Sequence, residues 1–304
     1  MYARNAESEG VKMTNAFLTH LSSTEVLIAD GATGTNYQQM GIDPGVRPED
    51  WVLDAPQNVL ALHRAFLDAG SDILLTNSFG ATRLRMRESK YANRVTEINR
   101  RAVELAREAA SAGKGTLVGG SMGSTGQLMV PFGSLTHSEA VDNYAEQAAA
   151  LAEAGADFLL LETFYALEEA LAASEGVRKV SSLPLVVSFS YDQGQRTMMG
   201  VRPSQTLDAF APLGVAAIGA NCGKTLEAME KIVEELAAEK KGIPIWAKPN
   251  AGLPKGIPPK YDITPWEMAE SAVRLVRAGA RIVGGCCGTT SAHIAAISAA
   301  IHSL

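Results

Sequence analysis

A short unit recurs along the chain and constrains the fold more than any other feature. A helical segment ends in Ala-Gly, two small or polar residues follow, and an apolar run begins directly afterwards. The unit occurs at Ala69-Gly70, at Ala154-Gly155 and at Ala278-Gly279. Glycine just past a helix end is the usual left-handed cap, and continuous apolar runs of about 4–6 residues are typical of strands buried on both faces. The repeat therefore predicts helices that alternate with buried parallel strands.

Eight such strands can be placed, and helical segments separate them. The predicted strands are 26–29, 73–76, 116–119, 158–162, 185–189, 215–219, 243–247 and 282–284. Apolar spacing and capping signals predict helical segments at 58–67, 95–110, 141–153, 167–180, 225–239, 265–277 and 291–301. Eight strands that alternate with helices predict a single-domain (β/α)8 TIM barrel. A doubly wound sheet is the alternative, but no glycine fingerprint follows the first strand.

Composition agrees with one globular domain. The chain has 304 residues, of which 46% are hydrophobic and 20% charged, and its formal net charge is -6. A nucleic-acid-binding protein would carry a basic surplus, and no apolar run approaches the ~20 residues of a membrane span. Three cysteines argue against a disulfide framework and favour a reducing, cytoplasmic setting. Residues 1–13 are expected to form a loose polar leader, and residues 14–304 the barrel.

Chemistry in such a barrel lies at the carboxyl ends of the strands, so the residues that end each strand are the candidates for a site. Ser121, Ser188 and Lys248 fall at strand ends as well, but the candidates chosen for the site are Asp30, Gly31, Thr76, Asn77, Glu162, Asn221, Cys222, Asn250, Cys286 and Cys287. All three cysteines of the chain are therefore expected on one rim. The sixth and eighth strands are one strand apart, so their ends lie roughly 10 Å from each other. Side chains and a metal ion can close that gap.

Three thiolates on one rim predict a zinc site, because soft ligands favour Zn²⁺ and three protein ligands leave a fourth position open. Two other uses of the thiols compete with this one. Free cysteines are commonly small buried hydrophobes, and a disulfide between the neighbours Cys286 and Cys287 would close a strained ring. Three thiolates make a poor Lewis acid for producing hydroxide but suit a fourth sulfur held as a nucleophile. The expected substrate is a thiol, and Asp30 and Glu162 could hold its ammonium group or instead cap the helices that follow.

Four motifs together resemble the homocysteine S-methyltransferase family, over essentially the whole chain after the leader. They are Asp30-Gly-Ala-Thr-Gly-Thr35, Gly219-Ala-Asn-Cys222, Pro249-Asn-Ala-Gly252 and Gly284-Gly-Cys-Cys-Gly-Thr-Thr290. The family includes betaine– and S-methylmethionine–homocysteine methyltransferases and the homocysteine module of cobalamin-dependent methionine synthase.

The resemblance implies a zinc-bearing barrel that methylates the thiol of homocysteine to give methionine. The zinc ligands would be Cys222, Cys286 and Cys287, and the residues in contact with homocysteine would include Asp30, Gly31 and Glu162. We expect four further polar residues of the same rim to bind substrate, namely Thr76, Asn77, Asn221 and Asn250. No side chain of the protein is expected to act as a catalyst, because the zinc-activated thiol belongs to the substrate.

The motifs leave the methyl donor open between a small onium compound and a methylcorrinoid. The family's betaine enzymes carry tyrosines where this chain has Gly80 and Thr163, which weakens the case for betaine, and the run 249–254 resembles the methionine synthase module more. No Asp-x-His-x-x-Gly corrinoid signature is present, so a methylcorrinoid would have to come on a separate protein. Two alternatives also stay open: a methyltransferase component of a corrinoid-dependent demethylation pathway, and a non-catalytic barrel with a structural zinc. Three arginines follow the second strand, namely Arg83, Arg85 and Arg87. They could bind an anionic donor, but a solvated helix face is the simpler interpretation.

Overall fold

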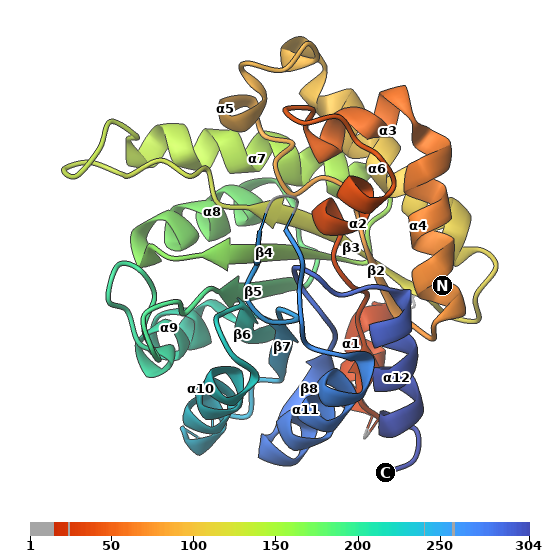
Figure 1. The fold of residues 1–304 in the computed structure, drawn as a ribbon. Helices are drawn as coiled ribbons and strands as arrows, with labels where there is room; N and C mark the ends of the chain where they lie inside the picture. Colours follow the sequence, from red (N-terminus) through yellow and green to blue (C-terminus); the bar gives the residue numbers. More distant parts are fainter. Residues whose placement is uncertain (1–14, 24, 240, 257–258) are drawn as a thin grey trace, which may run out of the picture.

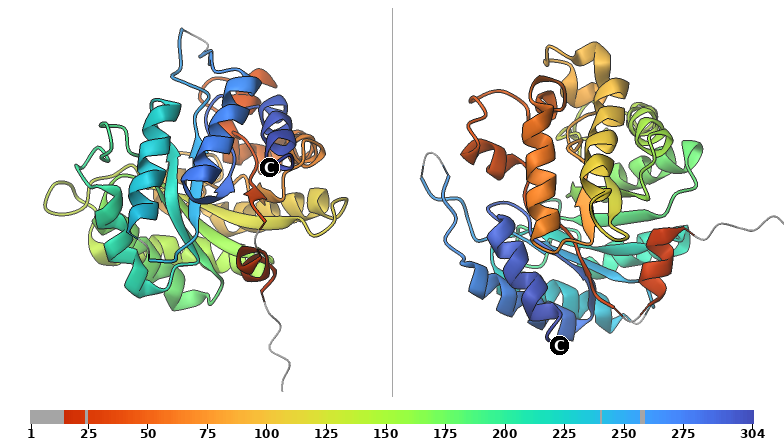
Figure 2. Two further views of the ribbon diagram at one scale, coloured as in Figure 1. Left: turned by 90° about the horizontal axis from the view of Figure 1, so that it is seen from below. Right: turned by 90° about the vertical axis from the view of Figure 1, so that its right-hand side faces the viewer.

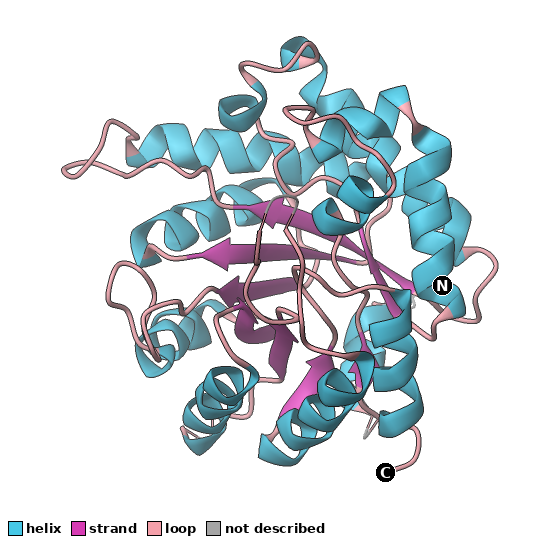
Figure 3. Ribbon diagram, viewed as in Figure 1, coloured by secondary structure: helices cyan, strands magenta, loops and turns pink. Residues whose placement is uncertain are grey.

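The computed structural model describes residues 15–23, 25–239, 241–256 and 259–304, and in them the predicted (β/α)8 TIM barrel is confirmed. Eight parallel strands pair in the order β1-β8-β7-β6-β5-β4-β3-β2, and helices surround them as an outer layer (Figure 1, Figure 3). The strands are β1 (Leu27–Ile28), β2 (Ile73–Leu75), β3 (Leu117–Gly123), β4 (Phe158–Phe164), β5 (Leu185–Phe189), β6 (Ala217–Cys222), β7 (Ile245–Pro249) and β8 (Ala280–Val283).

The barrel closes between β1 and β2, where a single backbone bridge joins the two segments. The Asp30 N–H donates to the Ile73 carbonyl at 3.0 Å. Two aspartate side chains complete the closure between β1 and β2. Asp72 Oδ2 accepts from the Ile28 N–H at 2.8 Å, and Asp30 Oδ2 accepts from the Leu75 N–H at 2.8 Å. Carboxylates thus take the place of carbonyls in the ladder and satisfy backbone donors that would otherwise be buried without a partner.

The seven helical segments named from the sequence are all present, and α9 is a further helix between β5 and β6, where none was named. It begins with a proline, which is common at a first helical position, and Gln205 Oε1 accepts from the Arg202 N–H at 2.9 Å before it. None of the helices in the described part of the chain is long and apolar enough to cross a membrane. The α-helices are α1 (Ala16–Ser22), α2 (Gly34–Gln39), α3 (Trp51–Asp54), α4 (Pro56–Asp68), α5 (Arg83–Met86), α6 (Val95–Ala110), α7 (His137–Glu153), α8 (Leu167–Val180), α9 (Pro203–Phe210), α10 (Leu226–Ala238), α11 (Pro265–Ala278) and α12 (Ser291–Ile301).

The short helix α1, red in Figure 2, closes the amino end of the barrel. Its Phe17 ring stacks on Phe158 at the start of β4, with ring centroids 4.1 Å apart. Phe17 is fully buried and belongs to the apolar cluster inside the strands. Asn15 anchors the segment by donating to the Asp157 carbonyl at 2.8 Å. The predicted leader, 1–13, lies outside the described residues and stays a prediction, as does the domain boundary at 14.

Four strands extend further toward their carboxyl ends than predicted. β3 continues to Gly123, β4 to Phe164, β6 to Cys222 and β7 to Pro249. The last residues of β6 and β7 still pair, with Asn221 opposite Lys248. An apolar run marks the buried middle of a strand, and polar site residues interrupt that run before the strand itself ends. Several candidate site residues are therefore held on strands, which position side chains more rigidly than loops do.

Candidate functional site

The three cysteines meet at the carboxyl end of the barrel. Cys222 ends β6, and Cys286 and Cys287 follow β8. The Sγ atoms of Cys222 and Cys286 lie 3.1 Å apart, and all three Sγ atoms lie within 4.8 Å of one another. Sulfur ligands arranged tetrahedrally at ~2.3 Å from zinc would lie roughly 3.8 Å apart. The donor set and its spacing therefore fit one zinc ion with a fourth position left for a ligand.

The loop after β8 is folded so that two adjacent thiols reach the same point. The Cys286 N–H donates to the Pro249 carbonyl at 2.8 Å, and the Cys287 N–H donates to Asn250 Oδ1 at 3.0 Å. Both bonds tie the loop to the end of β7. Gly284 is required here, because a Cβ would lie 2.7 Å from the Ala29 carbonyl oxygen, which follows β1, the strand paired with β8. The double-cysteine segment is therefore positioned by its neighbours on both sides.

Two residues of the rim have left-handed backbone angles that side chains rarely adopt. Thr163 in β4 has φ 63°, and Cys222 in β6 has φ 62°. Such conformations cost about 1–3 kcal/mol and persist only where the surroundings hold them, and a β-branched residue such as threonine is a stronger outlier than most. The pairing of β4 with β5 also shifts register at this level. The rim is therefore strained where two strand ends approach the thiols.

The thiols share hydrogen bonds, so they do not ionise independently. Hydrogen bonds from Cys222 and then Cys286 hold the pKa of Cys287 well below its ordinary value. The hydrogen bond with Cys286, followed by that with Cys287, raises the pKa of Cys222 well above its ordinary value. Because metal-bound cysteines are thiolates, a metal that enters this cluster must displace protons from it.

A buried ion pair lies beside the thiols. Lys248 Nζ is 2.7 Å from Asp30 Oδ1, and the two side chains are 3% and 2% exposed. Burial alone would lower the pKa of Lys248, but the charges of Asp30 and Glu162 more than offset this, and the pKa is raised. Lys248 was not among the residues predicted for the site. The sequence held a signal for it, because lysine is almost never fully buried without a partner and position 248 continues an apolar strand.

Glu162 on β4 is a second buried carboxylate of the rim. It accepts a hydrogen bond from Ser121 Oγ of β3 at 2.5 Å. Burial raises the pKa of Glu162 to about 7, and the nearby positive charge of Lys248 opposes this shift only in part. Since Lys248 is already paired with Asp30, an ionised Glu162 has no countercharge of its own. An ammonium group on a ligand would supply one.

The thiols and the charged groups share one cavity of about 540 Å³. Its walls include seven of the ten residues predicted for the site, together with Lys248: Gly31, Thr76, Asn77, Glu162, Cys222, Cys286 and Cys287. Asp30, Asn221 and Asn250 do not line it. Asp30 lies behind Lys248, Asn221 bonds to β4 and β5, and Asn250 bonds to the loop after β8 and to the Gly223 carbonyl. Contact of these three residues with substrate stays a prediction.

Two further residues of the cavity wall were missed from the sequence. Tyr261, in the loop after β7, lies so close to Gly288 that a Cβ there would overlap its ring. Burial, and then the charges of the thiols, raise the pKa of Tyr261 to about 12. Glu49 is 5% exposed and accepts from the Gly80 N–H at 2.6 Å. Both residues lie in segments without strand or helix periodicity of their own, so no pattern marked them.

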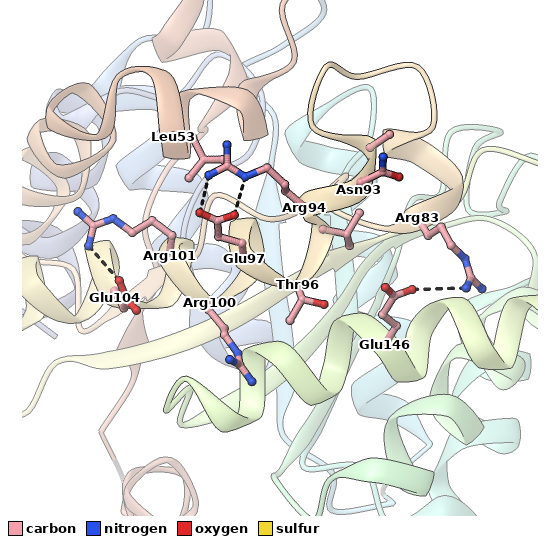
Figure 4. A pocket seen from close by; sticks show the side chains of 12 residues that line it. Leu53, Arg83, Asn93, Arg94, Thr96, Glu97, Arg100, Arg101, Glu104 and Glu146 are labelled. Atoms are coloured by element: carbon pink, nitrogen blue, oxygen red, sulfur yellow. Dashed lines mark hydrogen bonds and ion pairs between the residues drawn. The ribbon is translucent and has the colours of Figure 1, made fainter.

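A larger hollow, of about 800 Å³, lies along α6 and α7 and is lined by ion pairs (Figure 4). Its arginines pair with carboxylates of the same surface, and their side chains are well exposed: Arg94 with Glu97 at 2.5 Å, Arg101 with Glu104 at 3.0 Å, and Arg83 with Glu146 at 3.8 Å. Exposed pairs of this kind contribute little to stability. This hollow is a solvated surface, as expected for Arg83.

Arg85 differs from its neighbours Arg83 and Arg87, which are exposed and paired with carboxylates. Its Nη1 donates to the Ser124 carbonyl at 2.8 Å, and its guanidinium lies 5.1 Å from the centroid of the Phe79 ring. Phe79 lines the cavity that holds the thiols. One of the three arginines therefore reaches the edge of the site.

Sequence comparison connects this geometry with known proteins. The model of the family described as homocysteine S-methyltransferase matches residues 27–301. The methionine synthase of Mycobacterium tuberculosis is 30% identical over 307 residues, which cover 94% of this chain and 25% of that protein. The methionine synthase of Mycobacterium leprae is 30% identical over 296 residues, which cover 91% and 24%. The chain thus spans about a quarter of the length of these curated relatives.

Solved structures agree with the sequence comparison. The homocysteine methyltransferase MmuM from Escherichia coli, in its metallated form, superposes with a TM-score of 0.79 at 25% identity, covering 94% of this chain and 99% of that one. A methyltransferase from Methanosarcina mazei shares the fold alone, with a TM-score of 0.60 at 12% identity and coverage of 95% and 97%. The region matched by the family model contains all three cysteines of the cluster. On this match in sequence and fold, the chain belongs to the homocysteine S-methyltransferase family.

Proposed function

We propose that this protein transfers a methyl group to the thiol of homocysteine, giving methionine, with zinc held by Cys222, Cys286 and Cys287. One observation carries the proposal: three thiols at a spacing that suits zinc share a cavity with Glu162, a buried carboxylate without its own countercharge. An amino acid with a thiol at one end and an ammonium group at the other complements both features. Membership of the family supports the acceptor, and the metallated relative supports a metal.

Glu162 would receive the ammonium group of homocysteine. Its pKa of about 7 in the absence of a ligand would fall once a positive charge lies beside it, because an opposite charge favours the ionised form. Asp30 is paired with Lys248, so Asp30 would also act on the ligand through Lys248. Thr76 and Asn77 line the same cavity and are the proposed contacts for the rest of the amino-acid group.

A zinc ion bound at the three cysteines would lower the pKa of the substrate thiol and keep the sulfur as a thiolate. The thiolate sulfur attacks the methyl carbon of the donor. A sulfur–carbon bond forms as the bond between the methyl group and the donor breaks, and the donor leaves with that electron pair. The residues of the cavity contribute by orienting the two reactants, which turns a bimolecular encounter into a reaction within one site.

The aromatic lining of the cavity favours a methylcorrinoid over an onium donor. Quaternary ammonium and sulfonium groups are recognised by free aromatic faces. Among the described residues that line the cavity, the aromatic rings are Phe79 and Tyr261. Arg85 already lies over Phe79, and Tyr261 packs against Gly288. We therefore propose a methylated corrinoid as the first donor to test, with a small onium donor as the second.

Metal analysis tests the proposed centre. We expect one zinc per chain, and we expect Cys286→Ala to lose zinc and methyl transfer together. Met198→Ala is the control, because Met198 is a sulfur side chain that is 63% exposed and does not line the cavity. Stoichiometric zinc in a protein that lacks both Cys222 and Cys286 would contradict the centre. A Cys286→Ala protein that loses zinc and keeps full activity would assign the metal a structural role.

A panel of donors tests the second half of the reaction. Methionine formation from homocysteine would be measured with a methylcobamide, S-methylmethionine, dimethylsulfoniopropionate and betaine at equal concentrations. We expect turnover with the methylcobamide. Turnover with an onium compound alone would contradict the argument from the aromatic lining. Methyl transfer from a corrinoid protein to a different thiol, with none to homocysteine, would favour the demethylation alternative.

A further inference from the structure

One buried carboxamide, that of Asn221 in β6, contacts three other segments of the rim. Its side chain has no exposed surface. Oδ1 accepts from the Thr163 N–H of β4 at 3.0 Å and from Ser188 Oγ of β5 at 2.7 Å. Nδ2 donates to Thr163 Oγ1 at 2.7 Å. The same Nδ2 faces sulfur, at 3.4 Å from Cys222 Sγ and 3.9 Å from Cys286 Sγ.

The backbone decides which way round this amide lies. A main-chain N–H can only donate, so the atom of Asn221 that faces the Thr163 N–H must be the oxygen. Turning the amide over would set two donors against each other. The nitrogen is therefore directed toward Thr163 Oγ1 and the two sulfur atoms. One of its hydrogens serves the threonine hydroxyl, and the other is available to the thiols.

Asn221 also touches both of the strained residues of the rim. Thr163 and Cys222 have φ of 63° and 62°, and such residues persist only where neighbouring groups over-determine them. Asn221 bonds to the main chain and the side chain of Thr163 and directly precedes Cys222. A single side chain thus links the two left-handed positions to the thiol cluster.

We propose that Asn221 is a positioning residue of the metal centre, which donates an amide hydrogen to the sulfur ligands Cys222 and Cys286. The inference rests on the proposed zinc function. Three thiolates and a substrate thiolate would bring four negative charges to one divalent ion. A hydrogen bond to an ionised sulfur is charge-assisted and offsets part of that excess. Asn221 supplies it without adding a charge, and it fixes the direction in which the sulfurs point.

Asn221→Asp is the sharpest single test, because aspartate has the same shape and still accepts from Thr163 and Ser188 but presents an oxygen to the sulfurs. We expect zinc affinity, measured by competition with a chromophoric chelator, to fall by about 10–100-fold. In the cobalt-substituted protein at saturation, the thiolate charge-transfer bands should shift. Ser188→Ala is the matched control, since it removes a hydrogen bond to Oδ1 and touches neither sulfur. Its cobalt spectrum should match that of the native protein.

A second background separates the contact with sulfur from the support of the strained backbone. Thr163→Gly removes the need for that support, because glycine adopts positive φ without a steric penalty. Asn221→Asp in the Thr163→Gly protein should still lose zinc affinity by about 10–100-fold. Recovery of native affinity in that background would overturn the inference, as would an Asn221→Asp protein with native affinity and a native cobalt spectrum. Failure of the unmodified protein to bind zinc would instead sink the proposed function, and the inference with it.

Discussion

Glu162→Gln would test the electrostatics of the cavity with almost no change of shape. Glutamine can still accept the hydrogen bond from Ser121 Oγ, which lies 2.5 Å from Glu162 Oε1 in the native protein. The substitution removes only the ionisable group. Burial raises the pKa of Glu162 from 4.5 to about 7, so the folded protein keeps a proton on this group at pH values where the unfolded chain has released it.

The sign of the effect follows from that difference in proton binding. From pH 4.5 to about pH 7 the folded state binds more protons than the unfolded state, so the free energy of unfolding decreases as pH rises. A shift of ~2.5 pH units corresponds to roughly 3 kcal/mol. The Glu162→Gln protein does not undergo this pH-dependent loss of stability. Its stability relative to the native protein should therefore increase by roughly 3 kcal/mol between about pH 4 and about pH 8.

Urea denaturation of both proteins over this pH range measures the difference, in which other titrating groups cancel. Glu168→Gln is the control for removal of a carboxylate, because Glu168 is exposed in α8 and substitutions at exposed positions usually change the free energy of unfolding by no more than about 0.5 kcal/mol. A Glu162→Gln difference that does not vary with pH would refute the view of Glu162 as a buried carboxylate without a countercharge.

The same variant tests the proposed role of Glu162 in binding. Near neutral pH, homocysteine should displace a proton from native Glu162, because the incoming ammonium group favours the carboxylate. Calorimetry in two buffers of different ionisation enthalpy would detect that proton, and the glutamine protein should not release it. Loss of a hydrogen bond to a charged group, at about 1.5–3 kcal/mol, should weaken homocysteine binding by roughly 10–150-fold. Equal binding by both proteins would contradict the assignment of the ammonium site.

Three further substitutions test the scaffold by denaturation and circular dichroism. Lys248→Met leaves the buried Asp30 carboxylate unpaired, so the free energy of unfolding should fall by about 3–5 kcal/mol. Adding Asp30→Asn should restore most of that free energy, and a double variant without recovery would contradict the ion pair between Asp30 and Lys248. Gly219→Ala would place a Cβ on the main chain of Trp246, where β6 pairs with β7, so we expect no folded protein, and a native spectrum would contradict this register. Phe17→Ala should cost about 3–5 kcal/mol, and a loss below about 1 kcal/mol would show that α1 is not part of the core.

The sequence predicted those features whose cause is local. Glycine ends a helix through its own backbone conformation, and a continuous apolar run forms a strand that is buried on both faces. Both effects act within one short segment, so the repeat at Gly70, Gly155 and Gly279 predicted the barrel. The alternation then placed Cys222, Cys286 and Cys287 on one rim, because all strands of such a barrel end on the same side. The predicted middles of the strands were right for the same reason. The predicted carboxyl ends of β3, β4, β6 and β7 came too early, since polar site residues interrupt the apolar pattern.

Only the tertiary structure decided what each polar residue of the rim does. Lys248 pairs with Asp30 across 218 positions of sequence, and no local pattern reports on a partner so distant. The shifted pKa of Glu162 depends on burial by neighbouring strands. The contact of Tyr261 with Gly288 depends on how two loops meet. Periodicity reports average burial along one segment, whereas the role of a buried polar group is set by whichever atoms other segments bring within hydrogen-bonding distance.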